Sequence, residues 1–286
     1  MTDKTTRGPL AKEDYLEPSC VLCGEPYGAE PQIKPVPQQR IIEKMDDYMS
    51  RRDYAGAERH LLYWLEEAKL GRDQRGELMI RGELVGHYRK TGEKEKAYTS
   101  AEEELRLIRE LDFDGTVSGG TAYTNVATAY NAFGRNEEAL ALFEKARACY
   151  EANERTDPTL LGGLYNNMAL VLIALGRFPE AYALYEKAIE TMGKVPGGWL
   201  EQAITLLNLA DAHRAEKGFE AAESEIYELL DRAYELFNTP GVGGPGGPSR
   251  GYYAFVCEKC APTFSYYGYF LAAEDLNRRA KENYNA

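Results

Sequence analysis

The sequence predicts an all-α protein, a solenoid of about six antiparallel helix pairs preceded by an extended N-terminal arm. Residues 160–192 contain two runs of apolar residues at helical spacing, joined at Gly176. Residues 125–146 match residues 167–188 in register, and the turn glycines recur every 42 residues, at Gly92, Gly134, Gly176 and Gly218. A single helix pair cannot bury its apolar faces alone, so this fixed period predicts stacked copies.

Residues 1–37 form the predicted arm, because six prolines in this stretch prevent a long helix. Within it, Cys20 and Cys23, followed by Gly24, have the spacing of one knuckle of a zinc ribbon. A structural zinc site needs four ligands and only two are local. Three interpretations stay open: a metal site, a redox pair and an unliganded knuckle. We expect no cofactor unless zinc binds at these two cysteines.

A second pair of cysteines with the same spacing lies near the end of the chain, at Cys257 and Cys260. Counting back from Gly268 places both cysteines on the first helix of the last pair. They lie at positions that are apolar in the other repeats and that face the second helix. Buried cysteine behaves as a small hydrophobic residue. We therefore expect these thiols to be protected and do not expect all four cysteines to share one zinc ion.

Five helix pairs are predicted in residues 38–238. The first pair is a degenerate copy, with its turn at Tyr54–Glu58. Thr116 or Ser118 is suited to cap the first helix of the third pair. Asp157, which precedes a proline, is a good start for the fourth pair.

The last pair is predicted in residues 252–286, after a loop in residues 239–251 that is too rich in glycine and proline for regular structure. Its first helix is unusually aromatic. Such a repeat either caps the core with bulky side chains or forms the contact of a homodimer, and both interpretations stay open. The aromatic residues are Tyr252, Tyr253, Phe255, Phe264, Tyr266, Tyr267, Tyr269 and Phe270.

The repeated pattern of aromatic, apolar and small residues resembles the tetratricopeptide repeat. One copy has Tyr123, Val126, Ala127, Tyr130, Gly134, Ala139, Phe143 and Ala146, and the next has Tyr165, Met168, Ala169, Leu172, Gly176, Ala181, Tyr185 and Ala188. The period of 42 residues is similar to the long repeats of kinesin light chains and related bacterial proteins. The resemblance covers roughly residues 38–283 and implies a right-handed, TPR-like α-solenoid.

The charge and composition narrow the class of function. The net charge of −12 argues against general nucleic-acid binding, which depends on neutralising phosphates with lysine and arginine. No apolar run is long enough for a transmembrane helix, and residues 1–22 contain no apolar core of a signal peptide. We therefore expect a cytoplasmic protein with no membrane partner. An odd number of cysteines, five, fits reduced thiols.

Catalytic patterns are weak in this sequence. The three histidines, His60, His87 and His213, lie in different repeats and form no HExxH motif. The glycine-rich residues 241–247 lack the lysine and hydroxyl residue of a phosphate-binding loop. We expect a protein that is not an enzyme.

The resemblance implies a concave groove lined by the first helix of each pair. The groove residues that it implies are Arg89, Lys90, Thr124, Asn125, Thr128, Asn131, Asn166, Asn167, Asn208, Asp211 and Arg214. Asn125, Asn167 and Asn208 begin the same Asn-hydrophobic-Ala triplet. Their amides either bond the backbone of an extended peptide or bond across adjacent repeats, and both readings stay open.

The predicted function is non-catalytic binding of a protein or peptide in this groove, as a scaffold or adaptor. One alternative is a zinc-stapled or thiol-redox protein that uses Cys20 and Cys23. Another is a peptide-sensing regulator that lacks a DNA-binding domain.

Overall fold

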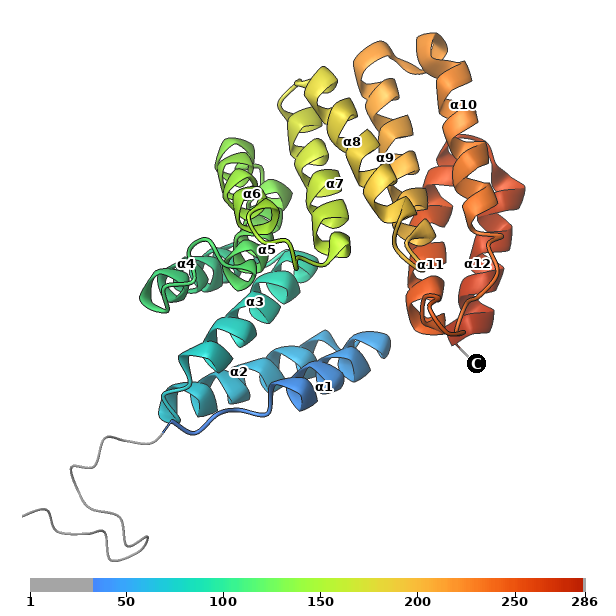
Figure 1. Ribbon diagram of the computed structural model, residues 1–286. Coiled ribbons are helices and arrows are strands. Elements are labelled where there is room, and N and C mark those ends of the chain that lie inside the picture. Colours follow the sequence, from blue (N-terminus) through green and yellow to red (C-terminus); the bar gives the residue numbers. More distant parts are fainter. Residues whose placement is uncertain (1–32, 285–286) are drawn as a thin grey trace, which may run out of the picture.

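The computed structural model describes residues 33–284, and all regular structure in this range is helical (Figure 1). The helices are α1 (Gln38–Ser50), α2 (Tyr54–Leu70), α3 (Gln74–Thr91), α4 (Lys94–Glu110), α5 (Val117–Ala132), α6 (Asn136–Glu151), α7 (Pro158–Ala174), α8 (Phe178–Gly193), α9 (Trp199–Lys217), α10 (Phe219–Leu236), α11 (Arg250–Tyr266) and α12 (Phe270–Tyr284). The predicted all-α solenoid of six helix pairs is confirmed. Residues 33–37 of the predicted arm contain no helix, as expected, and Val36 is buried against the first helix pairs. The predictions about residues 1–32, including Cys20 and Cys23, lie outside the described residues.

The turn glycines that repeat every 42 residues all have positive φ angles. Gly92, Gly134, Gly176 and Gly218 have φ angles of 76°, 83°, 74° and 80°. Glycine adopts this conformation without the steric cost that a side chain adds. In the degenerate first pair, Arg52 takes the left-handed conformation instead, with φ of 56°.

Two predicted boundaries differ from the structure by a few residues. The turn of the first pair is not at Tyr54–Glu58, because Asp53 caps α2 by accepting a hydrogen bond from the Gly56 amide and the helix starts at Tyr54. The last pair begins at Arg250 rather than at residue 252, since the Ser249 hydroxyl caps α11 by accepting from the amide of Tyr252. Both differences follow from capping side chains that sequence reasoning did not use.

Two other helix starts were predicted correctly. The Thr116 hydroxyl accepts a hydrogen bond from the Gly119 amide at 3.1 Å and begins α5. The Asp157 carboxylate accepts from the Thr159 amide at 2.9 Å, and a proline occupies the first turn of α7.

Successive helix pairs stack into a curved array. From α3 onward, the first helix of each pair packs against the first helix of the next, so that α3, α5, α7, α9 and α11 form a continuous layer. This layer lies on the inner side of the curve in Figure 1, with the second helices outside. We call the side of this layer that faces the interior of the curve the inner surface.

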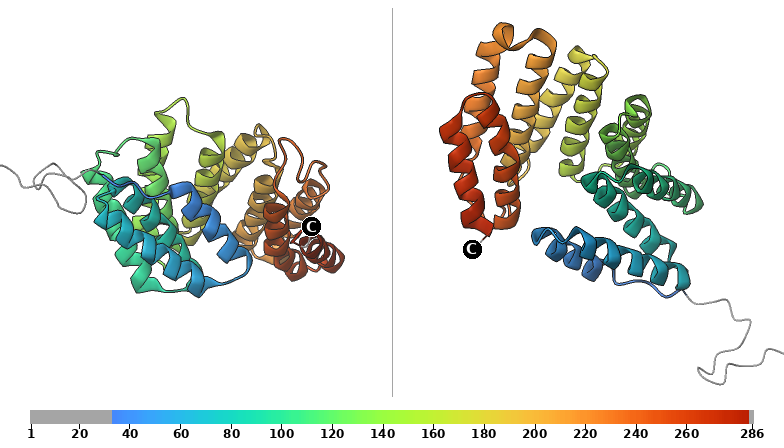
Figure 2. Two further views of the ribbon diagram at one scale, coloured as in Figure 1. Left: turned by 90° about the horizontal axis from the view of Figure 1, so that it is seen from below. Right: turned by 180° about the vertical axis from the view of Figure 1, so that it is seen from behind.

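The curve brings the first and last pairs next to each other, as the three views in Figures 1 and 2 agree. Arg52, in the turn between α1 and α2, forms an ion pair with Glu258 on α11. The hydroxyl of Tyr284 on α12 also donates to Glu258, at 3.1 Å. Residues more than two hundred positions apart therefore meet at this junction.

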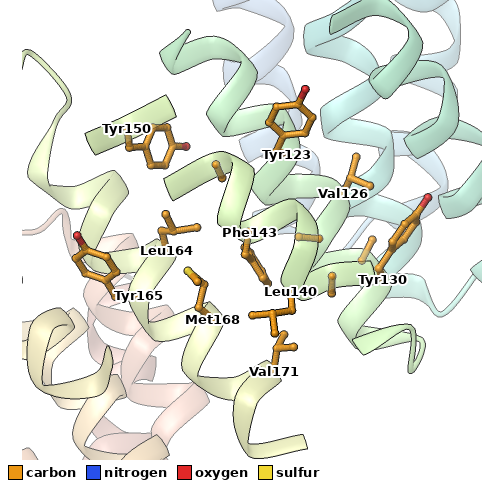
Figure 3. Packing of buried hydrophobic residues seen from close by; sticks show 14 of the residues in the cluster. Tyr123, Val126, Tyr130, Leu140, Phe143, Tyr150, Leu164, Tyr165, Met168 and Val171 are labelled. Atoms are coloured by element: carbon orange, nitrogen blue, oxygen red, sulfur yellow. The ribbon is translucent and has the colours of Figure 1, made fainter. Parts of the chain in front are cut away.

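The core runs through the stack in three clusters of buried side chains, and Figure 3 shows the central one. There, Phe143 of α6 lies between residues of α5 and α7 and is fully buried. Ala139 and Ala181, which the sequence predicts to be small because two helices cross there, have no exposed surface. These contacts join neighbouring repeats, as expected for a solenoid.

The aromatic residues of the last pair divide into two groups. Tyr253, Phe264 and Tyr267 are buried in the core of the final repeats, while Tyr266 and Phe270 are exposed. Cys257 and Cys260 are buried in the same core, as predicted. None of the helices in residues 33–284 combines the length and the apolar character that crossing a membrane requires.

Candidate functional site

The predicted groove residues lie on the first helices, and most of them are half-buried. Arg89 and Lys90 lie on α3, and burial lowers the pKa of both side chains. The remaining residues are Thr124, Asn125, Thr128 and Asn131 on α5, Asn166 and Asn167 on α7, and Asn208, Asp211 and Arg214 on α9. Half-buried polar groups on consecutive helices form a surface that can exchange hydrogen bonds with a bound chain.

Two of the three triplet asparagines bond across repeats. The Asn208 amide donates to Asn166 Oδ1 at 2.9 Å, which joins α9 to α7. Asn125 on α5 hydrogen-bonds the carboxyl group of Glu104 on α4. For these two residues, the structure shows the cross-repeat bonds that the sequence left open beside peptide binding.

The two groove threonines of α5, Thr124 and Thr128, make hydrogen bonds within their own helix. Thr124 donates its hydroxyl proton to the Gly120 carbonyl at 2.9 Å, and Thr128 donates to the Thr124 carbonyl at 2.8 Å. Their oxygen atoms keep lone pairs that can still accept from a ligand.

Asp211 and Arg214 contact the last repeat. Asp211 accepts a hydrogen bond of 2.6 Å from the Tyr267 hydroxyl, and the Arg214 guanidinium lies 5.1 Å from the ring centroid of Tyr266. Arg214 also hydrogen-bonds Tyr267, which raises the pKa of its guanidinium. These two groove residues therefore hold α9 against the turn between α11 and α12.

A cavity of about 510 Å³ lies between the first helices α3 and α5. Its lining includes Thr121 and Asn125, on the part of α5 that the resemblance assigns to the groove. The other lining residues are Gln38, Arg75, Leu78, Met79, Gly82, Glu83, Glu104, Phe113, Ser118 and Ala122. Its volume lies within the range of ligand-binding pockets in proteins, roughly 300–1,000 Å³.

Glu104 is the most unusual residue of this cavity. Only 2% of its surface is exposed, and its Oε2 atom has no hydrogen-bond partner. Burial raises the pKa of the Glu104 carboxyl well above its ordinary value, and the hydrogen bond from Asn125 only partly opposes this. A buried carboxyl group with one unpaired oxygen is costly, so its presence needs a physical reason.

Glu104 was not among the residues predicted from the sequence, although its place in the repeat marks it as unusual. Glu104 lies 42 residues before Ala146 and 84 before Ala188, both of which are fully buried. The second repeat therefore has a carboxylate where the next two have a methyl group. Gly82 makes room for it, because a Cβ atom there would lie 2.9 Å from Asn125 Nδ2 and 3.0 Å from Glu104 Oε1.

Glu83 is a second carboxyl group of the cavity that sequence reasoning did not assign to the groove. It lies 42 residues before Asn125, so it takes the place of the triplet asparagine in its own repeat. Burial raises the pKa of Glu83, Asp46 on α1 acts in the same direction, and Lys90 acts in the opposite direction.

A further cluster of possible metal ligands joins the second repeat to the first. One side-chain atom each from Glu58, His87 and Glu93 lies within 4.8 Å of the others. The Lys96 ammonium, however, lies 2.8 Å from Glu58 and 2.6 Å from Glu93. A metal ion would have to displace this ammonium, since it already neutralises both carboxylates.

Comparison with protein families identifies the repeat. A tetratricopeptide-repeat model matches residues 160–239, and a second tetratricopeptide-repeat model matches residues 120–153. The matched residues cover α6 and α8 to α10 and all but the first residues of α5 and α7. Among curated proteins, none matches the sequence.

Several solved structures are similar in their helical architecture. BtubC (BKLC) from P. vanneervenii is 19% identical, with 87% of this chain and 91% of that chain covered and a TM-score of 0.46. A protein of Podospora anserina with kinesin-light-chain TPR-like repeats is 20% identical, with coverages of 71% and 92% and a TM-score of 0.48. PilF of Pseudomonas aeruginosa is 16% identical, with coverages of 87% and 92% and a TM-score of 0.46. These similarities carry no argument about a ligand.

Proposed function

Because this chain contains tetratricopeptide repeats, we propose that it is a non-catalytic scaffold or adaptor that binds a protein or peptide segment along its inner surface. The observation that supports this most directly is the continuous layer of first helices, which presents half-buried amide, hydroxyl and charged side chains beside a cavity.

A peptide in extended conformation needs partners for its backbone N–H and C=O groups. Amide side chains supply both a donor and an acceptor, so they bind a backbone without selecting its sequence. Asn131 and Asn167 are half-buried on neighbouring first helices, and Arg89 adds a positive charge on α3. Together these groups favour an extended segment that contacts several repeats at once.

Selection of peptides from a random display library on the full chain tests the proposal. Selected peptides are then measured by fluorescence anisotropy against the variants Asn131→Ala, Asn167→Ala and Arg89→Ala. We expect at least one of these substitutions to weaken binding about tenfold, equivalent to about 1.4 kcal/mol. Thermal midpoints should stay close to that of the wild type.

Matched controls come from the second helices. Asn277 on α12 and Arg232 on α10 are exposed, so Asn277→Ala and Arg232→Ala remove the same chemical groups outside the inner surface. Both controls should bind as the wild type does. If the inner-surface variants all bind normally, or if the controls are the ones that lose affinity, the inner surface is not the binding site.

A further inference from the structure

We propose that the cavity between α3, α4 and α5 binds the positively charged side chain of a lysine or arginine in the partner peptide, with Glu104 as its principal anion. This inference rests on the proposed function and adds a chemical specificity to it. The cavity then selects one basic residue while the remaining inner surface contacts the peptide backbone.

Glu104 has an oxygen atom without a hydrogen-bond partner. The carboxyl group is buried beneath the cavity, one oxygen has no partner, and the Asn125 amide is the hydrogen-bonding neighbour of the group. A buried carboxyl oxygen without a partner costs roughly 1–3 kcal/mol. When a cation enters, the carboxyl group releases its proton to solvent and the unpaired oxygen accepts from a donor of the ligand. An ammonium or guanidinium group supplies such a donor together with the opposite charge.

Glu104 also differs from the residues at the equivalent place in the next two repeats. Ala146 and Ala188 occupy the equivalent place and pack without exposed surface, so the fold itself needs only a methyl group there. In the second repeat, a glycine at position 82 opens the space above the carboxyl group. The second repeat therefore has a large acidic side chain beneath a cavity where the next two repeats have a small apolar one. Such a local departure from the repeat pattern is expected at a functional site.

The lining of the cavity contains two carboxyl groups and one basic side chain. Glu83 adds a second carboxyl group to the lining. The basic residue of the lining, Arg75, has its guanidinium 5.6 Å from the ring centroid of Phe113. The two carboxyl groups and the hydroxyl of Thr121 offer several acceptors, which matches the three donors of an ammonium or the five of a guanidinium.

The test couples a change in the peptide to a change in the cavity. Peptides selected on the full chain are synthesised with each lysine or arginine replaced by norleucine, which has no charge. Both forms are titrated against the wild type, Glu104→Gln and Glu104→Ala. The alanine variant should fold, because alanine occupies the equivalent place in the next two repeats, and its thermal midpoint checks this.

We expect the peptide to contain one basic residue whose replacement by norleucine weakens binding to the wild-type protein by at least about tenfold. The same replacement should weaken binding to the Glu104→Ala protein by less than about threefold. In Gly82→Ala, replacement of the basic residue should also weaken binding by less than about threefold, because the added Cβ narrows the cavity from the α3 side. Glu186→Ala, at an exposed position on α8, is the matched control for the loss of a carboxylate and should change neither affinity.

Two results overturn the inference in different ways. Peptides that bind the inner surface but lose the same affinity in the wild type and in Glu104→Ala refute the cationic site and leave the proposed function intact. A chain that selects no peptide, or whose inner-surface variants bind normally, refutes the proposed function and this inference with it.

Discussion

Substitution of Glu104 by glutamine should stabilise the ligand-free chain, and the gain should increase with pH. In the folded protein, burial keeps the pKa of this carboxyl group well above the value of 4.5 that applies to an exposed side chain. Glutamine has nearly the same shape, still accepts a hydrogen bond from Asn125 and never ionises. The substitution therefore removes the cost of the charge and leaves the packing unchanged.

The sign of the effect follows from proton binding. Between pH 4.5 and the raised pKa of Glu104, the folded state holds a proton that the unfolded state has lost. The free energy of unfolding of the wild type therefore falls as pH rises, by up to about 1.4 kcal/mol for each pH unit. The full benefit of a protonated Glu104 is present only below pH 4.5.

Urea denaturation of both proteins at pH 5, 6 and 7 measures this difference. Burial also raises the pKa of Glu201, but both proteins contain this group and its contribution cancels in the difference. Glu83 lies close enough to raise the pKa of Glu104, so the variant Glu83→Gln is measured in the same way as a control. The prediction would be refuted if the difference in the free energy of unfolding stayed constant with pH, or if the wild type became more stable relative to the variant as pH rises. Either result would show that Glu104 is ionised and paired in the free protein.

Two further predictions concern the core. Ala139→Leu and Ala181→Leu should each lower the stability of the chain by roughly 1–3 kcal/mol, because both methyl groups are fully buried where helices cross; unchanged thermal midpoints would contradict the helix register. Burial raises the pKa of Cys257 to about 11 and that of Cys260 to about 12, so at pH 8 both thiols should react with a thiol reagent only as fast as the chain unfolds. Immediate modification of both in the native protein would mean that α11 is exposed.

Local chemistry accounts for what the sequence predicted well. Gly176 and its equivalents mark turns because glycine tolerates positive φ, and this constraint acts within a few residues. The places of Ala139, Phe143 and Ala181 in the core follow from helical spacing together with the repeat period. Both kinds of signal can be read along the chain, since each repeat contacts mainly its neighbours.

The groove residues were harder to predict, because hydrogen bonds between repeats decide which of them stay available. Asp211 and Asn208 lie on the first helices as expected, but Tyr267 and Asn166 already contact them. The polarity of a side chain can be read from the sequence. Whether another repeat satisfies that polarity depends on side chains 42 to 56 positions away.

The 42-residue period, the paired helices, the turn glycines and the buried face of each helix can all be read from the sequence. The position of Glu104 beneath a cavity, beside Gly82 and Asn125, depends on how the repeats pack, and so does the ion pair of Arg52 with Glu258. The physical reason is the range of the interactions. Helical periodicity and turn conformation depend on neighbours within one repeat, whereas the partners of a buried charge and the curvature of the stack depend on how whole repeats pack.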